Sequence, residues 1–137
     1  MQGLFLDTNI FLRYLLNDDP VRSPRCRDVF RAVEEQRLLV WTSGLVVAEI
    51  VFVLSSPRLY AFDRTTIRQV LLPLLGLANL RLERKALYPR VFTLYVEHAI
   101  DYVVAYHAAL LEHLGQSELL SFDAHFDRIP NLTRSEP

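Results

Sequence analysis

The sequence predicts an α/β fold, a three-layer α/β/α domain built on a central, mostly parallel sheet, with residues 1–137 forming one domain. Two observations support this prediction. Short apolar runs alternate with longer segments of helical periodicity, which is typical of parallel sheets covered by helices. In addition, 51% of the residues are hydrophobic, enough to supply a core without disulfides or a structural metal.

The first strand is the apolar run Leu4–Leu6, expected to be buried on both faces, and it stops at Asp7. Apolar residues from Ile10 to Leu16 then follow a helical period. Because ligands gather at the carboxyl ends of parallel strands, Asp7 occupies a position suited to a site. Asp is also a favoured helix N-cap, so capping and catalysis both remain open for this residue.

The next elements are a helix and a second strand. Residues 17–20 form a loop, Ser23 is the expected N-cap of a helix that starts at Pro24, and this helix ends near Glu35. Four arginines crowd the segment, and either a solvated face or an RNA-contacting ridge would explain them. The apolar run 38–41 predicts a second buried strand.

The most hydrophobic stretch, residues 45–54, predicts a largely buried helix that contains Glu49. A buried carboxylate must be protonated, paired with a base or bound to a cation. Either a salt bridge to an arginine or a functional role would account for Glu49. The remaining expected elements are a helix over 64–75 capped by Asp63, a strand over 80–82, helices over 85–97 and 101–114, and a strand over 119–122 that stops at Asp123.

Composition narrows the class of protein. The single Cys26 fits a reducing compartment, and the amino terminus lacks the features of a signal peptide or membrane span, so a cytoplasmic protein is expected. The net charge is −1, but 14 of the 15 basic residues are arginine, which suits phosphate contacts. Setting aside four acids for a metal site leaves 12 acids against 15 bases, about +3, which could attract a polyanion.

Four carboxylates are candidates for one site. Asp7 and Asp123 each follow a strand, Glu49 lies near the start of the helix after the second strand, and Asp101 begins the helix before the last strand. Clustered carboxylates repel one another unless a cation neutralises them, and hard oxygen ligands select Mg²⁺ or Mn²⁺. Metal-activated water attacking a phosphodiester is the expected chemistry. Thr8 and Asn9 could orient the water or a carboxylate, although a helix first turn explains them equally well.

The four histidines lack the spacing of zinc ligands and are expected to be surface or packing residues. His125 is the exception, because it follows Asp123 by two residues.

These residues resemble a PIN domain, in particular the small ribonucleases that act as VapC-type toxins of toxin–antitoxin pairs. Three segments carry the resemblance: Leu4–Asn9, Val47–Ile50 and Leu120–Pro130. The resemblance implies Mg²⁺-dependent RNA cleavage, a homodimer, and inhibition by a small antitoxin protein.

Asp7, Glu49 and Asp123 match the acidic positions of the family, whereas the fourth position aligns with Val104. Asp101 lies one helical turn earlier and could either reach the ion or only cap the helix. Asp127 could assist coordination or remain solvated. The leading hypothesis is therefore a metal-dependent endoribonuclease of a type II toxin–antitoxin system. The alternative is a catalytically impaired domain that binds RNA or protein, and a phosphohydrolase of small molecules is a weaker third reading.

Overall fold

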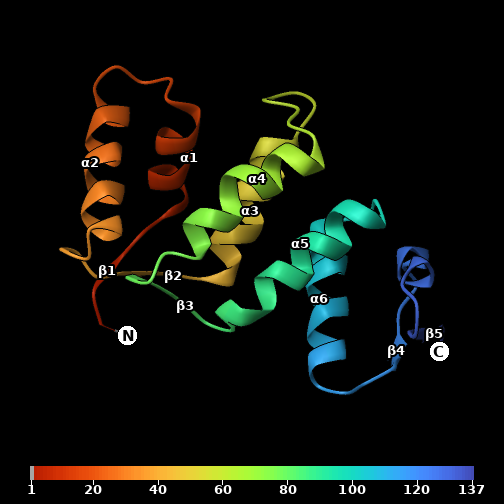
Figure 1. Cartoon of the computed structure of the whole chain (residues 1–137). Helices are drawn as coiled ribbons and strands as arrows, with labels where there is room; N and C mark the ends of the chain where they lie inside the picture. Colours follow the sequence, from red (N-terminus) through yellow and green to blue (C-terminus); the bar gives the residue numbers. More distant parts are fainter. Residues whose placement is uncertain (1) are drawn as a thin grey trace. The chain divides into compact units, whose positions relative to one another are not determined.

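The computed structural model describes residues 2–137 and contains two compact units, one ending at Lys85 and one running from Ala86 to Pro137 (Figure 1). A 3₁₀ turn, η1 (Lys85–Leu87), covers the junction. The elements of the amino-terminal unit are β1 (Leu4–Phe5), α1 (Thr8–Leu16), α2 (Arg22–Glu34), β2 (Val40–Thr42), α3 (Gly44–Ser55), α4 (Arg64–Leu75) and β3 (Leu80–Leu82).

The strands of the amino-terminal unit form a parallel sheet in the order β1-β2-β3. Two helices lie between consecutive strands and supply the crossover connection that parallel pairing requires. The expectation of a first strand buried on both faces is wrong, because Leu4 is 62% exposed and Phe5 45% exposed. Only Leu6, beyond the last residue of β1, is buried. The reason is position: β1 is an edge strand, and β2 occupies the centre.

The core of this unit lies where α1 packs against α2 and α3, and where α3 packs against α4. Phe11 and Phe30 meet edge to face across α1 and α2, with ring centroids 5.3 Å apart. Ser23 is not the N-cap of α2, contrary to the prediction. It lies buried inside the first turn, and its hydroxyl donates to the carbonyl oxygen of Arg13 at 2.7 Å. The Asp19 carboxylate instead accepts from the backbone N–H groups of Val21 and Arg22.

Helix α3 has an exposed face, which corrects the prediction of a largely buried helix. Val47, Ile50 and Leu54 are fully buried. Leu45 is 84% exposed, Phe52 is 73% exposed, and Glu49 lies between them on the exposed face. Positions i, i+4 and i+7 share one side of a helix, and only the opposite side of α3 packs into the core. The desolvation argument for Glu49 therefore does not apply.

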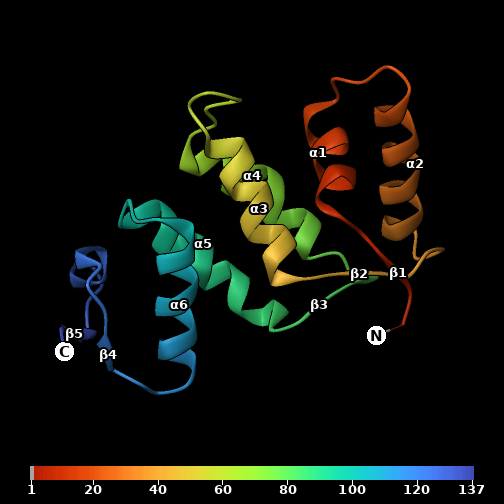
Figure 2. The ribbon, with the colours of Figure 1, turned by 180° about the vertical axis from the view of Figure 1, so that it is seen from behind.

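The carboxyl-terminal unit contains α5 (Tyr88–Glu97), α6 (Tyr102–His113), β4 (Glu118–Leu120), η2 (Ala124–Arg128) and β5 (Thr133–Ser135). Helices α5 and α6 lie side by side in both views (Figure 2). An aromatic cluster joins them, with the Phe92 and Tyr102 rings 5.7 Å apart. Strand β4 pairs in parallel with β5, a strand that the sequence did not predict, so the described strands form two sheets.

The predicted α/β class and the parallel pairing of strands are confirmed. The observed helices agree with the predicted ones to within a few residues at each end, and Asp63 caps α4 as expected, with the Thr66 N–H donating to its carboxylate at 2.7 Å. Within residues 2–137, every helix is too short or too polar to cross a bilayer.

Candidate functional site

Asp7 and Thr8 join β1 to α1. Asp7 has extended backbone angles and is the N-cap of α1, and its Oδ1 accepts a hydrogen bond from the Thr8 N–H at 2.8 Å. The capping role is therefore real. Asp7 is nevertheless exposed, so its second carboxylate oxygen can still bind a ligand.

Glu49, on α3, is tied to the same threonine. The buried Thr8 hydroxyl donates to Glu49 Oε2 at 3.0 Å. Thr8 thus holds Asp7 with its backbone N–H and Glu49 with its side chain. We call Asp7 and Glu49 the acidic pair.

Thr42 supports the acidic pair from β2, and the sequence did not single it out. Thr42 as a whole is 1% exposed. Its hydroxyl donates to the Leu6 carbonyl oxygen at 2.9 Å. This bond fixes the backbone immediately before Asp7. A polar residue at the end of a central strand is the only sequence feature that could have indicated such a role.

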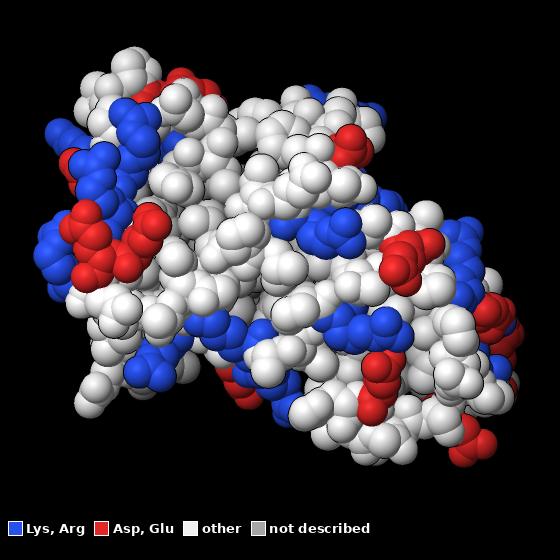
Figure 3. Space-filling view, viewed as in Figure 1, with Lys and Arg blue, Asp and Glu red and all other residues white. Residues whose placement is uncertain are grey.

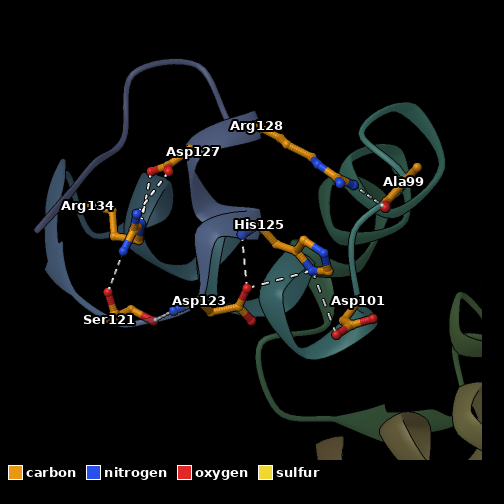
Figure 4. A network of polar contacts seen from close by, with 8 residues as sticks. All are labelled: Ala99, Asp101, Ser121, Asp123, His125, Asp127, Arg128 and Arg134. Carbon is orange, nitrogen blue, oxygen red and sulfur yellow. Dashed lines mark hydrogen bonds and ion pairs between the residues drawn. The ribbon is translucent and has the colours of Figure 1, made fainter. Parts of the chain in front are cut away.

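A second group lies wholly in the carboxyl-terminal unit. Ligand atoms of Asp101, Asp123 and His125 lie within 4.8 Å of one another. His125 Nδ1 is 3.8 Å from Asp101 Oδ2 and 3.7 Å from Asp123 Oδ1 (Figure 4). We call these three residues the Asp–Asp–His cluster. The spacing of two residues between Asp123 and His125 was the feature that set this histidine apart in the sequence.

Backbone contacts hold the cluster in place. Asp123 is the N-cap of η2, where its Oδ1 accepts from the His125 N–H at 2.9 Å. The Arg128 guanidinium donates to the Ala99 carbonyl oxygen at 2.9 Å, which ties η2 to the loop that carries Asp101. Arg134 donates to the Ser121 carbonyl oxygen, also at 2.9 Å, and so fixes the chain before Asp123 (Figure 4). Neither arginine was predicted to have a role.

Asp101 and Val104 differ sharply in exposure. The Asp101 side chain is 72% exposed, and it makes no side-chain capping bond to α6 although it occupies the N-cap position. Capping therefore does not account for this carboxylate. Val104, which aligns with an acidic position of the resembled family, is 5% exposed and packs in the core of the carboxyl-terminal unit.

Asp127 is engaged elsewhere. Its two carboxylate oxygens accept from Arg134, each at 3.0 Å, and this bidentate hydrogen bonding lowers the pKa of Asp127. The residue was expected to be either a supporting ligand or solvated. The observed pairing makes it a brace for Arg134.

A basic pocket of about 290 Å³ lies in the amino-terminal unit, lined by residues of α1 and α2, including Asn9, Arg13, Arg22 and Arg25. Arg13 pairs with Asp18 at 2.9 Å. Figure 3 shows basic side chains over α1 and α2 interspersed with acidic ones. The mixture explains why net charge alone gave no indication of this pocket.

A family model described as PIN domain matches residues 4–132. The chain belongs to the PIN domain family. The match extends over both compact units and contains the acidic pair and the Asp–Asp–His cluster. PIN domains are generally nucleases that use divalent metal, so a nuclease-type function follows from family membership. A search of curated proteins found no match.

The cluster of this PIN domain suits a divalent cation. Two carboxylates face a histidine nitrogen, and that nitrogen is buried and has no hydrogen-bond partner among residues 2–137. An ion of about 2.1 Å bond length places neighbouring octahedral ligands about 3.0 Å apart and opposite ones about 4.2 Å apart. The separations of 3.7 and 3.8 Å exceed the value for neighbouring ligands, so the side chains would draw closer around an ion. The donor set and the unpartnered buried nitrogen fit a metal of the kind PIN nucleases use.

Proposed function

We propose that this PIN domain is a divalent-metal-dependent endoribonuclease and the toxin of a type II toxin–antitoxin pair. The observation that carries the proposal is the Asp–Asp–His cluster in a chain whose family consists generally of nucleases. In this proposal the protein is a cytoplasmic homodimer, RNA is the substrate, and a small antitoxin protein inhibits it. Mg²⁺ or Mn²⁺ would be the cofactor.

The proposed metal ligands are Asp7 and Glu49 in the amino-terminal unit and Asp101 and Asp123 in the carboxyl-terminal unit. When bound, the divalent ion would lower the pKa of a water molecule and offset the charge that develops on the scissile phosphodiester. Thr8 is the proposed positioning residue for the acidic pair, because it holds one oxygen of each carboxylate and leaves the others available. Arg134 holds the backbone before Asp123, and Arg128 ties η2 to Ala99 in the loop before Asp101.

The basic pocket is the proposed contact for RNA phosphates. Arg25 makes no salt bridge among residues 2–137, and its fork-shaped guanidinium can donate two parallel hydrogen bonds to one phosphate. Asn9 lies in the same pocket and is the proposed polar contact beside it. An Arg25→Ala variant is expected to weaken RNA binding and to make it less dependent on salt concentration.

Cleavage of a pool of single-stranded and structured RNA tests the proposal. The purified protein is incubated with Mg²⁺ or Mn²⁺, beside EDTA and the variants Asp7→Asn and Asp123→Asn. We expect metal-dependent cutting that falls at least about 100-fold in either variant, because each loses a carboxylate proposed to hold the metal ion. The variants also guard against a contaminating nuclease.

Folded protein that binds RNA but cuts none of the pool would overturn the nuclease proposal. It would support the alternative of a binding module, which the buried Val104 at an expected acidic position favours. The toxin role has its own test, in which expression of the protein arrests growth and co-expression of the small protein encoded beside it restores growth. Arrest that persists in Asp7→Asn would contradict a toxin that acts by RNA cleavage.

A further inference from the structure

We propose that His125 is itself a metal ligand, so that the ion in the Asp–Asp–His cluster has a nitrogen donor and the site prefers Mn²⁺ to Mg²⁺. This inference rests on the proposed function only in treating the cluster as a metal site. It adds a ligand that is not among the acidic positions of the chain and assigns the preferred class of cation.

The first argument concerns the partner of His125 Nδ1. This nitrogen is buried although the side chain as a whole is 37% exposed, and it has no hydrogen-bond partner in residues 2–137. Its distances of 3.8 Å to Asp101 and 3.7 Å to Asp123 are too long for hydrogen bonds. A buried polar atom without a partner is costly, and a cation between the nitrogen and the two carboxylates would satisfy all three groups.

The second argument concerns what holds the ring. The backbone N–H of His125 donates to Asp123 Oδ1 at 2.9 Å, and Asp123 in turn accepts this bond as the N-cap of η2. The same short turn therefore fixes both a carboxylate and an imidazole. Arg128 brings the loop before Asp101 to this turn through the Ala99 carbonyl oxygen. The three ligand atoms thus come from two segments joined by a hydrogen bond (Figure 4).

The third argument concerns the missing acid. The position where the family would supply a further carboxylate holds Val104, which is 5% exposed and contributes no ligand atom. His125 supplies a third donor for the cluster instead. Replacing an oxygen by an imidazole nitrogen favours Mn²⁺ over Mg²⁺, because nitrogen suits transition metals and Mg²⁺ keeps oxygen ligands and water.

Pulsed electron paramagnetic resonance of bound Mn²⁺ tests the inference without using catalysis. The full chain is loaded with one equivalent of Mn²⁺, and ¹⁴N coupling to the ion is recorded. The wild type and His113→Ala are expected to show this coupling, whereas His125→Ala is expected to lose it. His113 is a suitable control because it is an exposed histidine at the end of α6 in the same unit. Asp7→Asn is measured as well, because it removes an acid that could compete for the ion.

Titration with each metal gives the second readout. His125→Ala is expected to raise the dissociation constant for Mn²⁺ by about tenfold or more. The constant for Mg²⁺ should change less, so that the preference for Mn²⁺ shrinks. Circular dichroism of each variant confirms folding, and His125→Asn is the substitute if the alanine variant does not fold.

Two results would overturn the inference: bound Mn²⁺ without ¹⁴N coupling in both the wild type and Asp7→Asn, or coupling that survives in His125→Ala. RNA cleavage by the same samples separates this failure from that of the proposed function. Metal-dependent cleavage without ¹⁴N coupling rejects only the histidine ligand. Coupling without cleavage rejects the nuclease and leaves the metal site.

Discussion

The acidic pair and the Asp–Asp–His cluster each contain two carboxylates, but the contacts that hold those carboxylates differ. In the acidic pair, each carboxylate accepts a hydrogen bond from Thr8, at 2.8 Å for Asp7 and 3.0 Å for Glu49. In the cluster, Asp101 accepts no hydrogen bond from any of residues 2–137, and His125 Nδ1 stands beyond hydrogen-bond distance from both acids. Hydrogen bonds from Thr8 to the carboxylates therefore hold the acidic pair. The cluster is held mainly through the backbone around it, by Arg128 and Arg134.

This difference indicates where a cation matters most. Hydrogen bonds from Thr8 already orient one oxygen of each carboxylate in the acidic pair. Among residues 2–137, the cluster receives one hydrogen bond, from the His125 N–H to Asp123 Oδ1, and leaves the Asp101 carboxylate and His125 Nδ1 without a hydrogen-bond partner, so a bound cation has more to stabilise there. We expect the acidic pair to depend mainly on Thr8 and the cluster mainly on metal.

The largest expected effect comes from placing an acid at position 104, one helical turn after Asp101. Val104→Asp puts a carboxylate at a site that is 5% exposed, and the unfolding free energy should fall by about 3 kcal/mol or more. Urea denaturation of the metal-free protein measures this change. Val103→Asp is the matched control, because Val103 is 53% exposed on the same helix and should cost far less. Equal losses in the two variants would show that Val104 does not lie in the core.

Removing the Thr8 hydroxyl tests the acidic pair. Thr8→Val keeps the shape of the buried side chain but removes the donor to Glu49, and we expect a loss of about 1 kcal/mol in stability. Cleavage of RNA should fall about tenfold, because Glu49 loses its orientation. Thr8→Ser retains the hydroxyl and should recover most of the activity. An equal loss in Thr8→Ser would mean that the methyl group, and not the hydrogen bond, is what matters.

Sequence patterns predicted much of the fold for reasons that the structure makes clear. The helices are long enough to express a 3.6-residue period, and Asp63 caps α4 through a local hydrogen bond. Burial was less predictable, because it depends on which neighbours an element finds. Leu4 and Phe5 are apolar yet lie on an edge strand, and α3 buries only one side of an almost entirely apolar sequence.

In the candidate site, too, some residues were predicted from the sequence and others were not. Asp7 and Asp123 were predicted from their positions after apolar runs, and each caps the turn or helix that follows. The roles of Arg128 and Thr42 were not predicted, because both depend on long-range hydrogen bonds. Arg128 donates to a carbonyl oxygen 29 residues away, and Thr42 donates to one 36 residues away. Single residues in a sequence carry no information about such partners. Strand β5 was missed because its three residues, Thr133–Ser135, include no apolar run.

Hydrogen exchange compares the metal dependence of the two groups directly. Adding Mn²⁺ to the metal-free protein should slow exchange severalfold at the amides of residues 121–128, where the backbone N–H groups of Asp123 and His125 support the cluster. A smaller change is expected at Thr8, whose N–H is already bonded to Asp7. The Asp123→Asn variant should abolish the protection of residues 121–128. Greater protection at Thr8 than in that segment would reverse the comparison.

The smallest expected effect concerns the ion pair between Arg134 and Asp127. Hydrogen bonds from Arg134 lower the pKa of Asp127, so the folded state binds this proton less readily than the unfolded state. The stabilisation is therefore present above the ordinary carboxyl pKa of 3.8 and is lost as the pH falls below it through the lowered pKa. Because the pair is exposed, the effect should be modest.

Denaturation midpoints measured between neutral and acidic pH should decline less steeply in Asp127→Asn than in the wild type. Identical slopes would mean that Arg134 braces Ser121 without help from Asp127.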